Sequence, residues 1–216
     1  PPDHLAWEYQ AKIRPWFQVF FYYLFSYPLK DINPFYLATF LRIFTSLLSM
    51  VSLLFFTRTV FSFLKNDLQK NYWLIFVNLI WFIPFINART SAENFSMIFF
   101  FIGLDLFLRD GKKFLSGVLL GLSFISRFQM GLFILPLFLH RLVFKKRWEG
   151  LAALGVLVSI GLGTLVDFWG YREWVFTPWR YFWVNLVEGK AASFGVSPWW
   201  FYFEVIFLKK EGILAM

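Results

Sequence analysis

The sequence predicts an all-α polytopic membrane protein, and three observations support this fold class. Of the 216 residues, 59% are hydrophobic and only 16% are charged, whereas soluble domains carry roughly 25% charged residues. Aromatic residues make up 24% of the chain, and Trp and Tyr are concentrated at membrane–water interfaces. Long apolar stretches alternate with short loops that hold most of the lysines and arginines, which is the charge pattern that sets the orientation of membrane helices.

Charge and cysteine usage exclude several classes of protein and site. The formal net charge of +8 would suit a nucleic-acid-binding protein, but that interpretation needs a basic stripe on a soluble face. Here the basic residues lie in short loops between apolar stretches, so we expect no nucleic-acid partner. The absence of cysteine excludes disulfides and thiolate metal sites. Since no metal-ligand spacing or Gly-rich phosphate loop occurs either, the sequence predicts no metal and no cofactor.

The first long apolar stretch, residues 35–57, can span a hydrocarbon core of about 30 Å. Residues 1–34 precede it and are expected to form a first outer loop. Within that loop, residues 16–28 are apolar but short and rich in Trp and Tyr. Such a segment suits an interfacial helix better than a membrane span.

The middle of the chain has shorter apolar stretches that are interrupted by polar groups. Residues 72–86 and 95–108 flank a polar octet at 87–94. Residues 114–139 are apolar, but Arg127 lies near their centre. An arginine at that position needs a buried partner, a turn at the membrane interface or an anionic ligand, because a charge at membrane depth is expensive.

The last third of the chain contains a small-residue stretch and then a long polar one. Residues 151–166 suit close helix packing and complete the predicted transmembrane region, 35–166. Residues 167–198 are expected to form a long outer loop crowded with Trp and Tyr. Loops of this length without secondary structure are uncommon and usually carry binding or catalysis. Residues 199–216 then start a further helix and end on the cytoplasmic side.

Four basic loops set the predicted orientation: residues 58–71, 109–113, 140–149 and 209–210. Lys and Arg favour the cytoplasmic side, so we place all four there. The polar octet, the surroundings of Arg127 and the long aromatic loop then share the opposite face. This arrangement requires a helical hairpin or a broken helix that turns near Arg127.

Polar residues from separate segments therefore converge on the outer face. For any one of them, the alternative to a site is an interhelical ion pair or an anchor in the headgroup layer. The convergence of the whole set favours a binding site for a polar, ring-shaped substrate beside lipid. The candidate substrate-binding residues are Trp7, Glu8, Arg14, Arg89, Asn94, Arg127, Asp167, Asn185, Pro198, Trp199 and Tyr202.

Four stretches of sequence carry a family resemblance. They are AWEYQAKIRPWF at 6–17, NARTSAENF at 87–95, LSGVLLGLSFISRFQMGLFILPL at 115–137, and the series from VDFWGYREW to SPWWFYF at 166–203. In order and approximate spacing they resemble motifs of the Alg9-like family of membrane mannosyltransferases, which have the GT-C fold. The resemblance is nearest to the members that add the third mannose of GPI anchors. The sequence departs from the family at Pro15, Phe194 and Trp200, where Ser, Tyr and His are usual.

The resemblance implies a GT-C-type helix bundle that transfers a mannosyl unit from a polyprenyl- or dolichyl-phosphate sugar to a lipid-linked glycan. The partners would be these two lipid-linked substrates and the membrane lipids, and the reaction would take place on the luminal or periplasmic face. The membrane would be that of the endoplasmic reticulum in a eukaryote and the inner membrane in a bacterium. The alternative class is a transporter or lipid flippase with an anion-binding arginine cluster, but the internal repeats typical of transporters are not visible in the sequence.

The same resemblance implies roles for single residues. Arg127 and Arg89 would bind the phosphate of the donor, which needs cationic groups as it leaves. Glu8 and Asp167 would orient sugar hydroxyls. The catalytic base of the family is an acidic pair that would precede Pro1, so the catalytic residue is expected outside this chain.

Aromatic residues near the end of the chain would complete the pocket. By the resemblance, Trp199 and Tyr202 would shape it, and Pro198 would fix the entry of the following helix. The identity of the acceptor and the oligomeric state stay open at this point.

Overall fold

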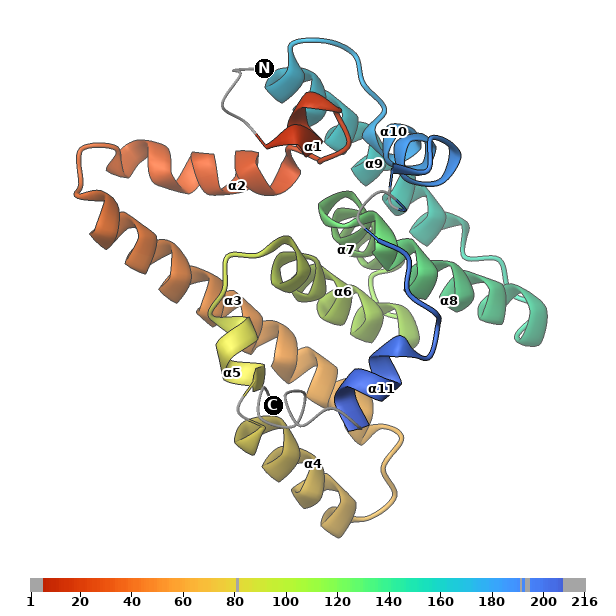
Figure 1. The fold of residues 1–216 in the computed structure, drawn as a ribbon. Helices are drawn as coiled ribbons and strands as arrows, with labels where there is room; N and C mark the ends of the chain where they lie inside the picture. Colours follow the sequence, from red (N-terminus) through yellow and green to blue (C-terminus); the bar gives the residue numbers. More distant parts are fainter. Residues whose placement is uncertain (1–5, 81, 191, 193–194, 208–216) are drawn as a thin grey trace.

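The computed structural model describes residues 6–80, 82–190, 192 and 195–207 (Figure 1). These residues are mainly helical and contain no strand, which confirms the all-α prediction for the described part. Short turns of other types lie between the longer helices: 3₁₀ turns at Tyr27–Leu29 and Phe128–Met130, and a π-helical turn at Trp183–Val187. The α-helices are α1 (Trp7–Gln10), α2 (Phe17–Ser26), α3 (Pro34–Phe61), α4 (Asp67–Leu79), α5 (Phe82–Asn87), α6 (Ala92–Leu108), α7 (Lys113–Ser126), α8 (Gly131–Phe144), α9 (Gly150–Tyr171), α10 (Thr177–Phe182) and α11 (Phe201–Phe207).

Two helices, α3 and α9, are long and apolar enough to cross a membrane. Helix α3 begins at Pro34, a residue favoured at the first helical position, and the Asn33 side chain caps it by accepting the Phe35 N–H at 2.9 Å. Only 17% of the apolar window of α3 and 28% of that of α9 is buried. An apolar helix at the core of a soluble protein is buried all round, so this exposure supports the membrane prediction.

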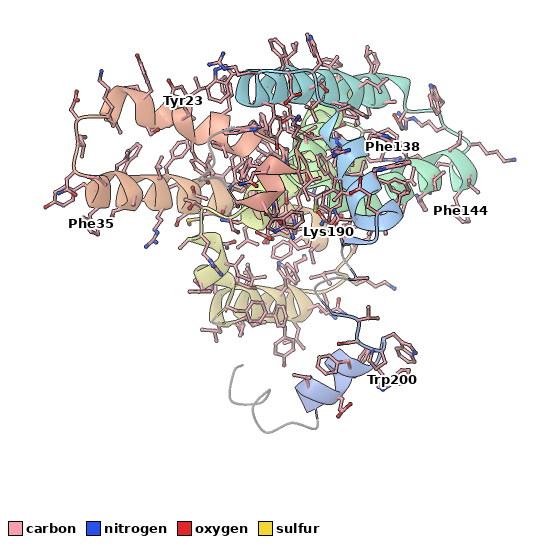
Figure 2. All side chains as sticks on the ribbon, turned by 45° about the horizontal axis from the view of Figure 1, so that its top comes forward. Tyr23, Phe35, Phe138, Phe144, Lys190 and Trp200 are labelled. Atoms are coloured by element: carbon pink, nitrogen blue, oxygen red, sulfur yellow. The ribbon has the colours of Figure 1, made fainter. Side chains whose placement is uncertain are left out.

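Helix α3 buries small polar side chains and exposes large apolar ones, the reverse of the arrangement in a soluble protein. Leu47 and Leu54 are 59% and 61% exposed, whereas Ser49 and Ser52 are buried. Figure 2 shows Phe35 pointing away from the bundle at the start of this helix, where its side chain is 83% exposed. Small and hydroxyl residues inside, with large apolar residues outside, are typical of helices that pack against each other in lipid.

Helices α7 and α9 approach each other closely through small residues. A Cβ atom on Gly117 would lie 1.9 Å from the Ala152 carbonyl oxygen, and one on Gly121 would lie 2.6 Å from the Ser159 Cβ. The Ser159 hydroxyl also donates across the interface to the Val118 carbonyl at 2.8 Å. The small-residue stretch thus packs as expected, with backbone against backbone.

The predicted break near Arg127 is confirmed. Helix α7 ends at Ser126, Arg127 is extended with φ −155° and ψ 112°, and a 3₁₀ turn leads into α8. Near the far end of α8, Arg141 donates to the carbonyl oxygens of Phe107 and Leu108 at 2.9 and 3.1 Å. Because those carbonyls lie at the start of the α6–α7 turn, α8 returns to the end from which α7 departs. Residues 113–144 therefore form a helical hairpin.

Ion pairs join three of the four basic loops at one end of the bundle, called here the inner end. Buried Asp105 on α6 pairs with Arg58 of α3 and, at 2.8 Å, with Arg109. Asp110 pairs with Arg147 at 3.0 Å. The predicted common side of these loops is therefore confirmed, while the fourth basic stretch, 209–210, lies outside the described residues.

Other segments differ in detail from the predicted boundaries. Helix α9 continues to Tyr171, five residues beyond the predicted end of the transmembrane region, so Asp167 is helical. The stretch expected as an open loop contains α10 and the π-helical turn. The predicted stretch at 72–86 is divided into α4 and α5 at Ile80, whose backbone is extended.

Candidate functional site

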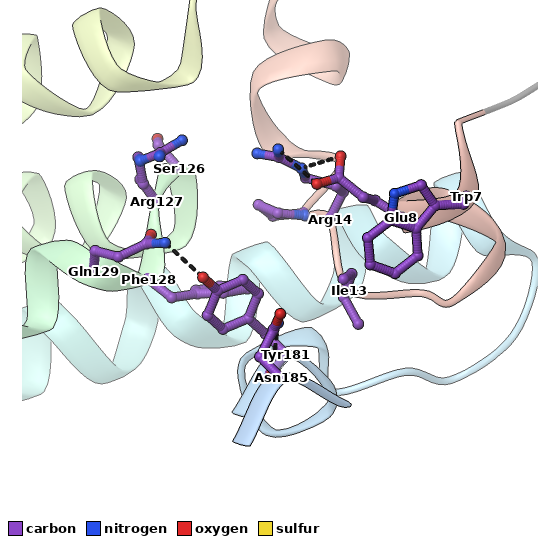
Figure 3. A pocket seen from close by; sticks show the side chains of 11 residues that line it. Trp7, Glu8, Ile13, Arg14, Ser126, Arg127, Phe128, Gln129, Tyr181 and Asn185 are labelled. Atoms are coloured by element: carbon purple, nitrogen blue, oxygen red, sulfur yellow. Dashed lines mark hydrogen bonds and ion pairs between the residues drawn. The ribbon is translucent and has the colours of Figure 1, made fainter. Parts of the chain in front are cut away.

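A cavity of about 430 Å³ lies at the outer end of the bundle, opposite the inner end in the predicted topology (Figure 3). Its walls come from three places far apart in the sequence: the α1–α2 region, the break between α7 and α8, and α10 with the π-helical turn. Five of the predicted site residues line it together. The lining residues are Trp7, Glu8, Ile13, Arg14, Pro15, Ser126, Arg127, Phe128, Gln129, Tyr181 and Asn185.

One wall carries a two-bonded ion pair. The Arg14 guanidinium donates through Nε and Nη2 to the two carboxylate oxygens of Glu8 at 2.8 and 2.9 Å. Between them the chain reverses at Lys12, a non-glycine residue with φ 59°, which brings Arg14 back beside α1. The Glu8 hydrogen bond raises the pKa of Arg14 above its usual value, so this arginine is always charged. Figure 3 shows the pair in the cavity wall.

The opposite wall carries a second ion pair. Arg127 contacts Glu93 at 2.5 Å between Nη1 and Oε1, and their side chains are 28% and 55% exposed. Glu93 lies in the first turn of α6, where the Ser91 side chain caps the helix. The charge of Glu93 also acts on Arg14. The outer end of the bundle therefore gathers two arginines and two carboxylates from three segments.

Amide and aromatic groups form the third wall. The Gln129 amide donates to the Tyr181 hydroxyl at 2.6 Å, and the Asn185 amide donates to the Tyr181 carbonyl at 2.9 Å. The rings of Phe128 and Tyr181 lie 5.5 Å apart at a steep angle. The sequence interpretation missed Tyr181 and Phe128. Both stood beside predicted residues, since Tyr181 is one helical turn before Asn185 and Phe128 follows Arg127.

Asp167 does not line the cavity. It is 3% exposed, accepts the Trp16 backbone N–H at 2.8 Å and accepts the Thr177 hydroxyl at 2.5 Å. Nearby, the Tyr171 hydroxyl donates to the Arg14 carbonyl at 2.6 Å. Both oxygens of Asp167 therefore serve the protein itself, and the end of α9 fixes the segment that presents Arg14 to the cavity.

Asn94 and Arg89 also lie away from the cavity. Asn94 is 3% exposed, and its amide nitrogen donates to the carbonyls of Asn87 and Arg89 at 3.0 and 2.9 Å. Its carbonyl oxygen accepts the Ser49 hydroxyl at 2.9 Å. Asn94 thus shapes the polar octet from inside. Arg89 is exposed and lines a different cavity with Arg42.

Of the three predicted residues near the end of the chain, two can be placed relative to the cavity. Pro198 and Trp199 do not line it, and Trp199 is 79% exposed. Tyr202 belongs to α11, but its side chain lies outside what the structure describes. In the described part of the chain, no three His, Asp or Glu side chains come close enough to hold a metal ion.

The fold and the cavity define a helical membrane protein with a charged, aromatic-lined site at one end. Comparison with known proteins gives its family. The chain belongs to the Alg9-like mannosyltransferase family, whose model matches residues 2–216, and this confirms the resemblance carried by the four sequence motifs.

One curated relative is named as a mannosyltransferase. It is the "Probable Dol-P-Man:Man(7)GlcNAc(2)-PP-Dol alpha-1,6-mannosyltransferase" of Schizosaccharomyces pombe, which is 27% identical over 120 residues. The match covers 54% of this chain and 22% of the relative, so the chain matches about a fifth of the relative's length. No solved structure matches the chain significantly.

Proposed function

We propose that the complete protein transfers a mannosyl unit from a dolichyl- or polyprenyl-phosphate donor to a lipid-linked glycan, on the luminal or periplasmic face of its membrane. Membership of the Alg9-like mannosyltransferase family supports this reaction class. The name of the fission-yeast relative supports a dolichyl-phosphate mannose donor. The transporter alternative has no comparable support.

The observation that carries this proposal is the pair of arginines in one cavity, each beside a carboxylate. Arg127 contacts a single carboxylate oxygen within the described residues, whereas a guanidinium has five N–H donors. The remaining donors are free to bind the phosphate of the donor lipid. That phosphate gains negative charge as the sugar leaves, and fixed cationic groups stabilise it most at that stage. Arg14 donates two hydrogen bonds to Glu8, so it has fewer remaining donors for the phosphate than Arg127.

The rest of the cavity suits a sugar. Its volume of about 430 Å³ is within the range of small-molecule sites. Glu8 and Asn185 supply hydrogen-bonding groups, and the rings of Trp7 and Tyr181 supply flat surfaces for the apolar face of a pyranose. We assign these four residues to sugar binding. Asp167 is reassigned from sugar binding to positioning, because it is buried away from the cavity that Glu8 lines and its oxygens accept hydrogen bonds from Trp16 and Thr177.

Proton transfer from the acceptor needs a separate group. The cavity's ion pairs engage the carboxylates of Glu8 and Glu93 with arginines, so neither is a suitable proton acceptor. On the family resemblance, the catalytic base is proposed to precede Pro1.

The test is a transfer assay of the complete protein with dolichyl-phosphate mannose and defined lipid-linked glycans. Arg127→Ala should lower turnover by a factor of about 100 or more and leave membrane insertion intact. The matched control is Arg172→Gln, which removes an exposed charge that lines no cavity described here. Unchanged turnover in Arg127→Ala would refute the phosphate role. Lipid movement across the membrane without mannosyl transfer by the wild type would favour the flippase alternative.

A further inference from the structure

A second cavity lies beside the same polar octet and has no assigned role. Its volume is about 580 Å³, and it opens between the outer part of α3 and the segment that leads into α6. The two cavities share this segment, because Glu93 pairs with Arg127 of the first cavity while the residues just before it line the second. The lining residues are Arg42, Phe85, Ala88, Arg89, Thr90 and Ser91.

The charges of this cavity are unbalanced. In the part of the chain that the structure describes, neither Arg42 nor Arg89 has a carboxylate partner. The Arg89 guanidinium lies over the ring of Phe85 at 5.4 Å. Arg42 is exposed on α3, a candidate membrane span. An arginine in a span without a counter-charge is expensive, and such residues are usually retained for a ligand.

The backbone around Arg89 is held in place by the protein. The Gln18 side chain of α2 donates to the Thr90 carbonyl at 2.8 Å. Asn94 donates to the Arg89 carbonyl, and Ser91 caps α6. The fixed segment therefore presents Arg89 and the Thr90 hydroxyl beside Arg42 of α3, and neither guanidinium has a carboxylate partner among the described residues. The positive end of the α6 dipole adds to the attraction for an anion.

We propose that this cavity binds the phosphate of the acceptor lipid, apart from the donor phosphate at Arg127. This inference rests on the proposed function. A lipid-linked glycan has its phosphate beside the lipid chain and its accepting hydroxyl on a sugar further along. Its phosphate therefore needs a site near the membrane, separate from the cavity where transfer occurs. Paired guanidinium groups match the oxygens of a lipid diphosphate or a phosphodiester.

Binding measurements on the complete protein in detergent micelles test the site directly. The probes are a short-chain polyprenyl diphosphate, phosphatidylinositol, and polyprenyl phosphate as the donor analogue. Arg42→Gln and Arg89→Gln should each weaken one of the first two probes about tenfold, the loss expected for one charge-assisted contact. Which of the two responds identifies the acceptor class. Binding of polyprenyl phosphate should change less than about twofold.

Two further variants guard against a folding defect. Arg42→Lys keeps the charge but loses the two-pronged geometry, so it should fold and fall between the wild type and Arg42→Gln. Arg172→Gln removes a charge from elsewhere on the outer side and should match the wild type. The site is refuted if polyprenyl phosphate is weakened as strongly as the acceptor probes, or if phosphatidylglycerol is bound equally well and weakened equally.

Steady-state kinetics distinguish a failure of the acceptor-phosphate site from a failure of the proposed mannosyl transfer. In the transfer assay both Arg→Gln variants should raise the KM for the acceptor about tenfold and leave the KM for the donor unchanged. Normal transfer with an unchanged acceptor KM in both variants would overturn the site and spare the function. Arg42-dependent binding of a lipid phosphate by a protein that transfers no mannose would overturn the function and spare the site.

Discussion

Asp167 and Trp16 are 151 residues apart in the sequence, and the carboxylate of Asp167 accepts the Trp16 backbone N–H at 2.8 Å. Two more contacts reinforce this junction. The Tyr171 hydroxyl donates to the Arg14 carbonyl at 2.6 Å, and the Trp16 ring lies against Gly170. The end of α9 therefore determines where Arg14 stands in the cavity.

The first prediction concerns Asp167. Asp167→Ala leaves the Trp16 N–H and the buried Thr177 hydroxyl without their acceptor, so it should destabilise the protein by about 2 kcal/mol. Asp167→Asn keeps an oxygen for Trp16 and should cost less. Thermal unfolding in detergent measures both. A normal unfolding temperature in Asp167→Ala combined with a raised donor KM would restore the sugar-binding role.

A pair of glycines on α9 tests the same junction by shape. A Cβ on Gly170 would lie 2.2 Å from the Trp16 ring, whereas one on Gly161 would meet nothing within 4 Å. Gly170→Ala should therefore lower the unfolding temperature and impair transfer. Gly161→Ala should be neutral or stabilising, because alanine favours a helix by up to about 1 kcal/mol over glycine. Equal effects of the two substitutions would contradict the close packing of Trp16.

The Arg127–Glu93 pair should matter for binding more than for folding. Both side chains are partly exposed, and such pairs contribute about 1 kcal/mol or less to stability. Arg127→Gln should abolish binding of dolichyl phosphate with little change in unfolding temperature. Glu93→Gln frees Arg127 from its competing carboxylate and should tighten that binding. Weaker binding in Glu93→Gln would mean that Glu93 positions Arg127 instead of competing for it.

Asp105 at the inner end should matter for folding more than for binding. Its side chain is fully buried and accepts from Thr59 and from two half-exposed arginines, Arg58 and Arg109, so Asp105→Ala should cost about 1–3 kcal/mol. The control is Asp67→Ala. Asp67 is 92% exposed in its pair with Lys70, so its loss should change stability by less than about 1 kcal/mol. Denaturant or thermal unfolding compares the two, and a cost for Asp105→Ala as small as that of the control would be evidence against the network.

Hydrophobic pattern and charge placement were sufficient for much of the fold. They predicted α3, the hairpin that turns at Arg127 and the common side of three basic loops. The expense of a charge at membrane depth also identified Arg127 as a site residue. A charge at membrane depth is equally expensive at Arg42, eight residues after the start of α3, although Arg42 is not among the predicted site residues.

The remaining features depend on contacts between distant segments. A buried carboxylate such as Asp167 and a cavity-lining one such as Glu8 are alike in sequence, because each lies among aromatic residues. Only the fold shows that Asp167 is buried away from the cavity and bonded to Trp16 and Thr177, whereas Glu8 lines the cavity. Asn94 was likewise predicted to bind substrate, but only the fold shows that its side chain is buried and bonded to Ser49, Asn87 and Arg89. The helical turn that places Tyr181 beside Asn185 is missed when the sequence predicts an open loop for this stretch.

The spacing of two arginines on helix α3 makes the position of Arg42 depend on bilayer thickness. Arg42 and Arg58 are sixteen residues apart, and the residues between them carry no charge. In an ideal helix this spacing is about 24 Å, slightly less than the hydrocarbon thickness of about 30 Å. Long arginine side chains can reach outward over the difference. With Arg58 fixed at the inner end by Asp105, membrane thickness sets the depth at which Arg42 meets the headgroups. A thicker bilayer should draw its guanidinium into the hydrocarbon, and a thinner one should lift it clear.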